Sequence, residues 1–201
     1  VSNVTSMHRM FRGASSFNQN LNSWDVSSVN DMSTMFQNAE SYNQDLSSWD
    51  VSSVETMYAM FQDADSFNNN SLYNWIVTDV MNTSQMFENA DIFNQDLSNW
   101  TTSSLNNIDS MFEGAVSFNN GQSAGVSSTV MTFDITNCRR LNDVFKNATS
   151  FNGDISNWDT SNIEQLNSTF QNASNFNVDI SGWNVANVTT ANNTFYSASS
   201  F

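Results

Sequence analysis

The stretch VNDMSTMFQNAESYNQDLSSWD, residues 29–50, recurs with small changes along the whole chain. Most copies contain Met-Phe-x-x-Ala, an aromatic residue followed by Asn, and a Trp a few polar residues later. The Phe anchors of the copies are Phe11, Phe36, Phe61, Phe87, Phe112, Phe145, Phe170 and Phe195. Successive anchors are 25, 25, 26, 25, 33, 25 and 25 residues apart. Because a period of about 20–29 residues is typical of leucine-rich-repeat solenoids, residues 1–201 are predicted to form a single solenoid array.

Two columns of large apolar residues predict a strand in each coil. The aliphatic column consists of Leu21, Leu46, Leu72, Leu97, Val130, Ile155 and Ile180. The aromatic column follows three residues later and consists of Trp24, Trp49, Trp75, Trp100, Phe133, Trp158 and Trp183. Such columns become ladders of like residues when parallel strands stack about 4.8 Å apart. We therefore expect one short parallel strand per coil, around residues 45–49 in the second full copy, with a bend that turns the Trp inward.

The residues that precede each Phe anchor predict a short helix. Val29, Met32 and Phe36 lie at i, i+3 and i+7, which is the spacing of one helix face. Two residues after each Phe stand Gly13, Asn38, Asp63, Asn89, Gly114, Asn147, Asn172 and Ser197. Gly and Asn best tolerate the left-handed conformation that ends helices. The predicted fold class is an α/β repeat solenoid, leucine-rich-repeat-like, with about eight coils of about 25 residues, each with a short parallel strand and a short helix or helical turn.

Charge excludes several classes of partner. Five Lys and Arg residues stand against 20 Asp and Glu residues, so the net charge is −15. Nucleic acid is not an expected partner, because affinity for it depends on neutralising phosphates. Cationic groups, metal ions and neutral sugars remain possible partners. No apolar run approaches the roughly 18 residues that a membrane span needs, so no membrane insertion is expected within this segment.

Both ends of the chain fall inside a repeat. Val1 stands at the position that Val26 holds in the next copy, and the chain stops within a copy at Phe201. Solenoids need atypical polar caps at their ends, and neither end carries one. We expect the chain to be a segment of a longer protein, in which case a missing signal peptide says nothing about the parent.

The residue types needed for nucleophilic catalysis are scarce. The chain has one histidine, His8, and one cysteine, Cys138, which lie several coils apart. Cys138 aligns with Val29, Val54 and Val188, so it is predicted to be a small buried core residue. No phosphate loop, dinucleotide fingerprint or zinc spacing is present. The chain is therefore not expected to be an enzyme.

Carboxylates form two columns that allow more than one interpretation. Asp45, Asp96, Asp154 and Asp179 precede the aliphatic column, and Asp25, Asp50, Asp134 and Asp159 follow the aromatic one. Aspartates at such positions can bond backbone N–H groups in turns or line a solvated edge. Stacked carboxylates can also bind calcium, which makes the first four weak candidate metal ligands. Paired-carboxylate glycosidase chemistry is a third possibility, although no unique cleft is implied.

An outward row of small polar residues predicts a contact face for sugars or a partner protein, unless it is simply exposed to solvent. The row consists of Asn22, Ser47, Tyr73, Ser98, Met131, Ser156 and Ser181. The longest spacing contains an insertion at about residues 120–129, in a coil that also carries Arg139 and Arg140. This irregular coil is a second candidate contact site, or else a tolerated insertion. Three Asn-x-Ser/Thr sequons are candidate glycosylation sites, at Asn3, Asn82 and Asn187.

These motifs resemble the BspA-like leucine-rich-repeat surface proteins, and in particular the branch of unknown function found in mycoplasma lipoproteins and marine protists. The residues that carry the resemblance are Val29-x-x-Met32-x-x-Met35-Phe36-x-x-Ala39, Phe67-Asn68 and Phe93-Asn94-Gln95-Asp96-Leu97-Ser98-x-Trp100, and it extends over the whole chain. The resemblance implies a solenoid on a cell surface, with adhesion or scaffolding as its role and no catalytic residues.

The sequence thus predicts a non-enzymatic extracellular repeat module for adhesion, protein–protein interaction or structural assembly, with a protein or glycan as partner. The alternative is a calcium-stabilised solenoid, or one that binds a small ligand or ice. Regular Thr-x-Thr rows would favour ice binding, and the sequence lacks them.

Overall fold

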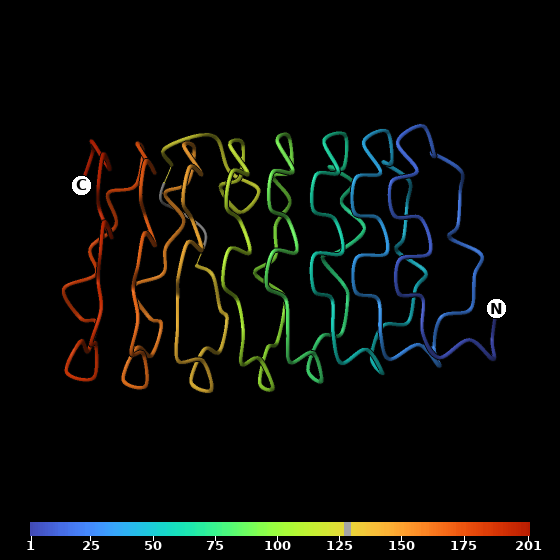
Figure 1. Cartoon of the computed structure of the whole chain (residues 1–201), viewed down its shortest axis with the longest axis horizontal. Coiled ribbons are helices and arrows are strands. Elements are labelled where there is room, and N and C mark those ends of the chain that lie inside the picture. The colour runs from blue at the N-terminus through green and yellow to red at the C-terminus, as the bar shows by residue number, and fades with distance from the viewer. Residues whose placement is uncertain (127–129) are drawn as a thin grey trace.

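The computed structural model of the chain describes residues 1–126 and 130–201. The chain winds into flat coils that stack side by side in sequence order, so that the two termini lie at opposite ends of an elongated body (Figure 1). Asn43 contacts Asn18 at a separation of 25 residues, Asn94 contacts Asn68 at 26, and Asn152 contacts Asn119 at 33. The spacings seen in the sequence are therefore the separations between residues that touch.

The prediction of a strand and a helix in each coil is wrong. Within residues 1–126 and 130–201 there is neither a helix nor a strand, including at residues 29–36 and 45–49. Regular pairing is limited to isolated parallel bridges, namely Ser6–Asp31, Asp31–Thr56, Thr56–Asn82, Asn82–Asn107, Val130–Asp154, Arg140–Gln165 and Gln165–Thr190. The architecture is a stack of coils built from turns, and not an α/β solenoid of the leucine-rich-repeat type.

Two left-handed residues in every coil explain why no helix forms. The column two residues after Phe, from Gly13 to Ser197, has φ between 55° and 73°, so its predicted left-handed conformation is confirmed. A second left-handed column lies four residues earlier, with φ between 50° and 62°, at Arg9, Thr34, Ala59, Gln85, Ser110, Asp143, Ser168 and Asn193. A left-handed residue cannot continue a right-handed helix. This second column was missed because its members share no residue type.

Backbone N–H groups alternate between two kinds of partner along each coil. In the second full coil, Met35, Gln37 and Ala39 donate to the carbonyl three residues before, at 3.0–3.3 Å, which closes successive turns. The residues between them donate at 2.7–3.0 Å to the next coil, with the pairs Met32 to Thr56, Thr34 to Tyr58, Phe36 to Met60 and Asn38 to Gln62. Because buried backbone donors need acceptors, this segment of each coil depends on the neighbouring coil for every second hydrogen bond.

Continuous stacks of aromatic rings form the core. Within a coil, the Phe anchor stacks on the aromatic residue six positions later with ring centroids 3.8–4.3 Å apart, as in Phe61–Phe67 and Phe87–Phe93. Between coils, successive anchors stack at 5.4–5.8 Å. Each stacked pair contributes about 0.5–1.5 kcal/mol beyond the area it buries. The two Phe positions of the repeat therefore make one aromatic core along the whole stack.

The tryptophan column joins the core to the backbone of the preceding coil. Trp49 Nε1 donates to the carbonyl of Leu21 at 3.0 Å, and Trp100 Nε1 donates to Leu72 at 2.8 Å. The expected bend is a turn in which the N–H of Trp49 donates to Leu46 at 3.1 Å. The Leu-x-x-Trp motif thus orients the indole so that its ring is buried and its N–H is satisfied.

An asparagine ladder runs beside the aromatic core. The side-chain Oδ1 of each Asn in the Phe-Asn or Tyr-Asn pair accepts the backbone N–H of its counterpart in the next coil, at 2.7–3.0 Å. Its members are Asn18, Asn43, Asn68, Asn94, Asn119, Asn152 and Asn177. We did not predict this ladder, although the recurring Asn after the aromatic residue was its signal.

The single cysteine is part of the core, as predicted. Cys138 is fully buried, and its Sγ lies 3.6 Å from the carbonyl of Leu105. Burial raises the pKa of this thiol to about 12. His8 is exposed in the first coil. Over the described residues, no helix has the length and apolar character that crossing a bilayer requires.

Glycine substitutions distinguish the observed turns from a helix. Ser110 has φ of 56°, so Ser110→Gly should raise the free energy of unfolding by about 0.5–1 kcal/mol, because Gly adopts positive φ without steric cost. Asn106→Gly, at an exposed position of the same segment with ordinary φ, should lower it by about 0.5 kcal/mol, because Gly increases the backbone entropy of the unfolded chain. Urea denaturation measures both variants. Destabilisation by both would contradict the left-handed conformation at Ser110.

Candidate contact site

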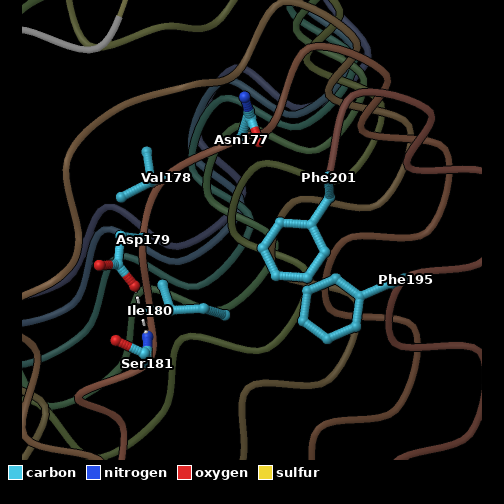
Figure 2. A pocket seen from close by; sticks show the side chains of 7 residues that line it. All are labelled: Asn177, Val178, Asp179, Ile180, Ser181, Phe195 and Phe201. Atoms are coloured by element: carbon cyan, nitrogen blue, oxygen red, sulfur yellow. Dashed lines mark hydrogen bonds between the residues drawn. The ribbon is translucent and has the colours of Figure 1, made fainter.

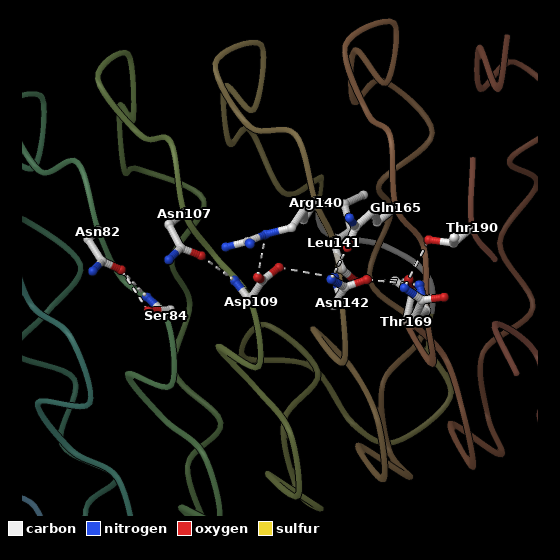
Figure 3. Close-up of polar contacts among 11 residues, drawn as sticks. Asn82, Ser84, Asn107, Asp109, Arg140, Leu141, Asn142, Gln165, Thr169 and Thr190 are labelled. Carbon is white, nitrogen blue, oxygen red and sulfur yellow. Dashed lines mark hydrogen bonds and ion pairs between the residues drawn. The ribbon is translucent and has the colours of Figure 1, made fainter. Parts of the chain in front are cut away.

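The inserted coil interrupts the backbone bridges between coils. Parallel bridges run from Ser6 to Asn107 and resume from Arg140 to Thr190, and across the described residues none joins Asn107 to Arg140. At this gap Arg140 Nε lies 2.9 Å from Asp109 Oδ2, and the N–H of Asn142 donates to Asp109 Oδ1 at 3.1 Å (Figure 3). Contacts to the side chain of Asp109 therefore join the two coils at the place where the column of backbone bridges is interrupted.

The same junction marks a change in how one polar row is bonded. The row consists of Ser84, Asp109, Asn142 and Asn167, which stand three residues before their Phe anchors. Before the junction, the N–H groups of Ser84 and Asp109 donate to the side chain two residues earlier in their own coil. After it, Asn142 and Asn167 accept the N–H of their counterparts in the next coil, at 3.0 Å. Figure 3 shows the row passing from local turns to a ladder at Asp109. The inserted coil thus divides this face into two differently bonded parts.

The basic residues of this coil are paired with acidic residues of adjacent coils. Lys146 Nζ lies 2.9 Å from Glu113 Oε1, and Arg139 Nη1 lies 3.9 Å from Glu164 Oε1. The side chains of Arg139 and Arg140 are 63% and 49% exposed. Pairs this exposed contribute at most about 1 kcal/mol each to stability. Both guanidinium groups, which were predicted as contact residues, thus lie on the surface.

Burial and charge act in opposite directions on Asp109. Its partial burial raises the pKa of the carboxyl group, while the adjacent Arg140 opposes that rise. The net direction is upward, so the ion pair only partly offsets the loss of hydration.

Asparagines of the ladder hold the described part of the insertion, residues 120–126. Their side-chain Nδ2 groups donate to loop carbonyls: Asn94 to Gln122 at 2.8 Å, Asn119 to Val126 at 3.1 Å and Asn152 to Gly125 at 2.8 Å. Asn120 is fully buried, and its Oδ1 accepts the N–H of Leu97 at 2.8 Å. The predicted insertion extends to residue 129, and residues 127–129 lie outside the described part. Residues 120–126 are thus held by side-chain hydrogen bonds from three coils.

A hydrogen-bonded row of amide and carboxyl groups runs along the position after each Phe anchor. Gln37 donates to Gln62, and Gln62 Nε2 donates to Glu88 Oε2 at 3.0 Å. Partial burial raises the pKa of Glu88 to about 7, assisted by the negative charges of Glu113 and Asp63. A bond from Gln85 and the charge of Lys146 act in the opposite direction. Glu88 is therefore a position of this row where protonation changes near neutral pH.

Glu88 should make stability depend on pH. Its folded-state pKa lies above the ordinary value of 4.5. Its stabilising contribution to the free energy of unfolding is therefore fully present below about pH 4.5 and is lost as the pH rises through 7. Glu88→Gln places at this position the residue found at Gln37, Gln62 and Gln171. The variant should be more stable than the wild type at pH 8 by about 1 kcal/mol, a value reduced for solvent screening.

The measurement is urea denaturation at pH 5 and pH 8. Glu55→Gln, which changes an exposed carboxylate, is the matched control and should follow the wild type. Equal stability of Glu88→Gln and wild type at pH 8 would show that the ionised carboxylate of Glu88 does not destabilise the fold.

Most of the predicted outward row is accessible. Ser47, Tyr73, Ser156 and Ser181 are exposed, whereas Asn22 and Ser98 are half-buried. Asn22 is bonded on both sides, since its Nδ2 donates to Asp45 at 2.7 Å and its Oδ1 accepts the N–H of Ser48 at 2.8 Å. A shallow hollow beside it is lined by Asn20, Asn22, Ser23 and Ser48. The row remains a prediction as a binding face.

Met131 does not belong to this row. It is fully buried, whereas Val130 is 39% exposed, so the alignment that placed Val130 in the aliphatic column was wrong by one residue. The indole of Trp158 donates to the carbonyl of Met131 at 2.9 Å, as Trp49 does to Leu21. Phe133 follows Met131 after two residues and not three, so the turn before the aromatic residue is absent in this coil.

The aspartates proposed as weak metal ligands cap turns. The Oδ1 atoms of Asp45, Asp96, Asp154 and Asp179 each accept the N–H of the Ser two residues later, at 2.9–3.0 Å. Figure 2 shows this bond between Asp179 and Ser181, beside the stacked Phe195 and Phe201. These bonds lower the pKa of Asp179. Residues 1–126 and 130–201 hold no group of three or more His, Cys, Asp or Glu side chains placed to share a metal ion.

Removal of divalent cations should leave stability unchanged. The four carboxylates are already engaged in turns, and a metal that binds only the folded state would raise the melting temperature. We expect the melting temperature in 5 mM EDTA to agree within about 1 °C with that in 5 mM calcium chloride. An increase of several degrees in calcium would support the calcium-stabilised alternative.

The three candidate glycosylation sites differ in accessibility. Asn3 and Asn187 are exposed. Asn82 is half-buried, its Oδ1 accepts both the N–H and the hydroxyl of Ser84, and Ser84 itself is buried. Asn82 is thus the least accessible of the three.

A protein-family model matches the chain. The family model described as "Mycoplasma protein of unknown function, DUF285" matches residues 1–91, 67–132 and 121–201, so successive copies cover the whole chain. No curated protein and no solved structure matches the chain.

Proposed function

Since the chain belongs to the mycoplasma repeat family DUF285, whose function is unknown, we propose from its geometry that it is a non-enzymatic interaction module at a cell surface, for adhesion, protein binding or assembly. The sequence resemblance to BspA-like surface proteins is compatible with this family and supports an extracellular location. The exposed sequons at Asn3 and Asn187 support the same location if the source glycosylates secreted proteins.

The observation that carries the proposal is the hydrogen-bonded support of residues 120–126. A merely tolerated insertion needs no support from the rest of the fold. Here Asn94, Asn119 and Asn152 each turn an amide group toward loop carbonyls, while their Oδ1 atoms continue the ladder. A loop held in one conformation loses little entropy on binding, which favours its use as a contact element. The exposed Arg139 and Arg140 lie in the same coil.

The net negative charge of the chain favours a protein or a glycan as its partner. A net charge of −15 opposes binding to nucleic acid and to anionic membrane surfaces. The exposed hydroxyl groups of the outward row suit hydrogen bonding to sugars, and Tyr73, 37% exposed, provides an aromatic surface within that row.

A substitution that releases the loop but keeps the ladder tests the proposal. Asn94→Asp retains an acceptor for the N–H groups of Asn119 and Gly121 and removes the donor to Gln122. Asn43→Asp makes the same change at a ladder position that holds no insertion. Binding of the whole chain to immobilised collagen, fibronectin, laminin and a glycan array would be measured by surface plasmon resonance. Wild type and Asn43→Asp should bind at least one of these surfaces, and Asn94→Asp should bind it at least fivefold more weakly.

Limited proteolysis provides the accompanying structural readout. Asn94→Asp should increase cleavage within residues 120–126, while Asn43→Asp should not. Equal binding by all three proteins, together with faster loop cleavage in Asn94→Asp, would mean that the loop is not the contact element.

A further inference from the structure

Exposed aliphatic side chains gather on one edge of the stack beside the inserted loop. Ile92, Val116 and Val126 are 46%, 39% and 42% exposed. Backbone hydrogen bonds of 3.1–3.2 Å join their segments in turn, from Ser117 to Asp91, from Ser150 to Val116 and from Gly125 to Ser150. The three side chains thus belong to adjoining segments of one surface, which we call the edge patch.

The repeat itself does not require apolar residues at these positions. The column of Ile92 otherwise holds Ser16, Ser41, Ser66, Ser117, Ser150, Asn175 and Ser200. The column of Val116 otherwise holds Ser15, Glu40, Asp65, Asp91, Thr149, Ser174 and Ser199. Since polar residues satisfy the fold in every other coil, core packing does not account for the aliphatic ones. Clustered exposed apolar side chains mark interaction sites on soluble proteins.

Three carboxylates lie in the column of Val116, on the coils that precede Val116 in the stack. Glu40, Asp65 and Asp91 are all exposed. None of them is in an ion pair with another described residue. Partial burial raises the pKa of Asp65, and the negative charges of Asp91, Glu40 and Asp63 add to this rise. The row therefore carries negative charge that no ion pair among the described residues compensates, and it continues directly into Val116.

We infer that the edge patch docks a segment of a partner protein in which cationic side chains are followed by aliphatic ones. Cationic groups of such a segment would compensate Glu40, Asp65 and Asp91, while its aliphatic groups would cover Ile92, Val116 and Val126. Charge complementarity selects this occupant, because an acidic segment would be repelled and a neutral sugar would leave both the charge and the aliphatic groups unmatched. The inference rests on the proposed interaction role and specifies the chemistry of the partner.

Three synthetic peptides test this inference against the whole chain. The first has three Lys residues alternating with Ser and then Leu-Val-Leu. The second replaces Leu-Val-Leu with Ser residues, and the third replaces each Lys with Glu. Fluorescence anisotropy at 50 and 200 mM salt measures their binding. The first peptide should bind at least tenfold more tightly than either of the others, and its affinity should fall as salt rises, because exposed charges are screened.

Variants built from residues that the repeat already uses locate the site. Ile92→Ser and Val116→Thr should each weaken binding of the first peptide about fivefold, which corresponds to the loss of one aliphatic contact. Ile76→Thr is the matched control, because Ile76 is 59% exposed outside the edge patch and Thr101 occupies its column in the next coil. Asp65→Asn should weaken binding mainly at 50 mM salt.

Equal binding of all three peptides, no binding of the first, or equal loss in Ile76→Thr and Ile92→Ser would overturn the inference. Sedimentation that shows a dimer abolished by Ile92→Ser would also overturn it, because the occupant would then be a second copy of this chain. If the peptides fail while binding to matrix surfaces still depends on Asn94, the docking inference fails and the proposed interaction role stands.

Discussion

The alternation of backbone donors between a coil and its neighbour is the constraint on which the rest of the structure depends. Thr34 and Asn38, both left-handed, turn the chain so that every second N–H points at the next coil. No coil can then satisfy its backbone alone, because residues 1–126 and 130–201 contain no helix or strand that would do so. The unit of stability is therefore the pair of adjacent coils, as in other repeat proteins whose contacts are confined to neighbours.

The regular columns of the sequence follow from this constraint. Backbone hydrogen bonds hold adjacent coils in register, so each side chain contacts the side chain at the equivalent position of the next coil. Each position therefore favours a residue type that packs against, or bonds to, another residue of the same type. Phe stacks on Phe, Asn bonds to the backbone of the next Asn, and the Trp indole bonds to the previous coil. The inserted coil keeps the aromatic stack through Phe133, which lies 6.0 Å from Trp100 and 6.3 Å from Trp158, although its bridges are interrupted. The two proposed contact sites, the inserted loop and the edge patch, lie where this self-matching is broken.

Features that repeat one residue type were predictable from the sequence, and features that repeat only a backbone conformation were not. The period, the buried Cys138 and the left-handed column that begins at Gly13 were predictable, because each is carried by residue identity. The helix over residues 29–36 was wrongly predicted, because apolar spacing of i, i+3 and i+7 arises equally from successive turns. Of the candidate face, Met131 was misplaced by one residue, because the inserted coil omits a turn whose absence has no sequence signal.

By itself, the sequence determined that this protein is a repeat array, how long each coil is and which residues stack. It did so because contacts between identical positions leave identical residues in the chain. The tertiary structure alone decided that the coils are made of turns, that ladder asparagines hold the loop, and that Ile92 and Val116 share a surface with three carboxylates that form no ion pair with a described residue. These features depend on backbone dihedral angles and on contacts between unlike residues of different coils. Neither of these produces a periodic pattern in the amino-acid sequence.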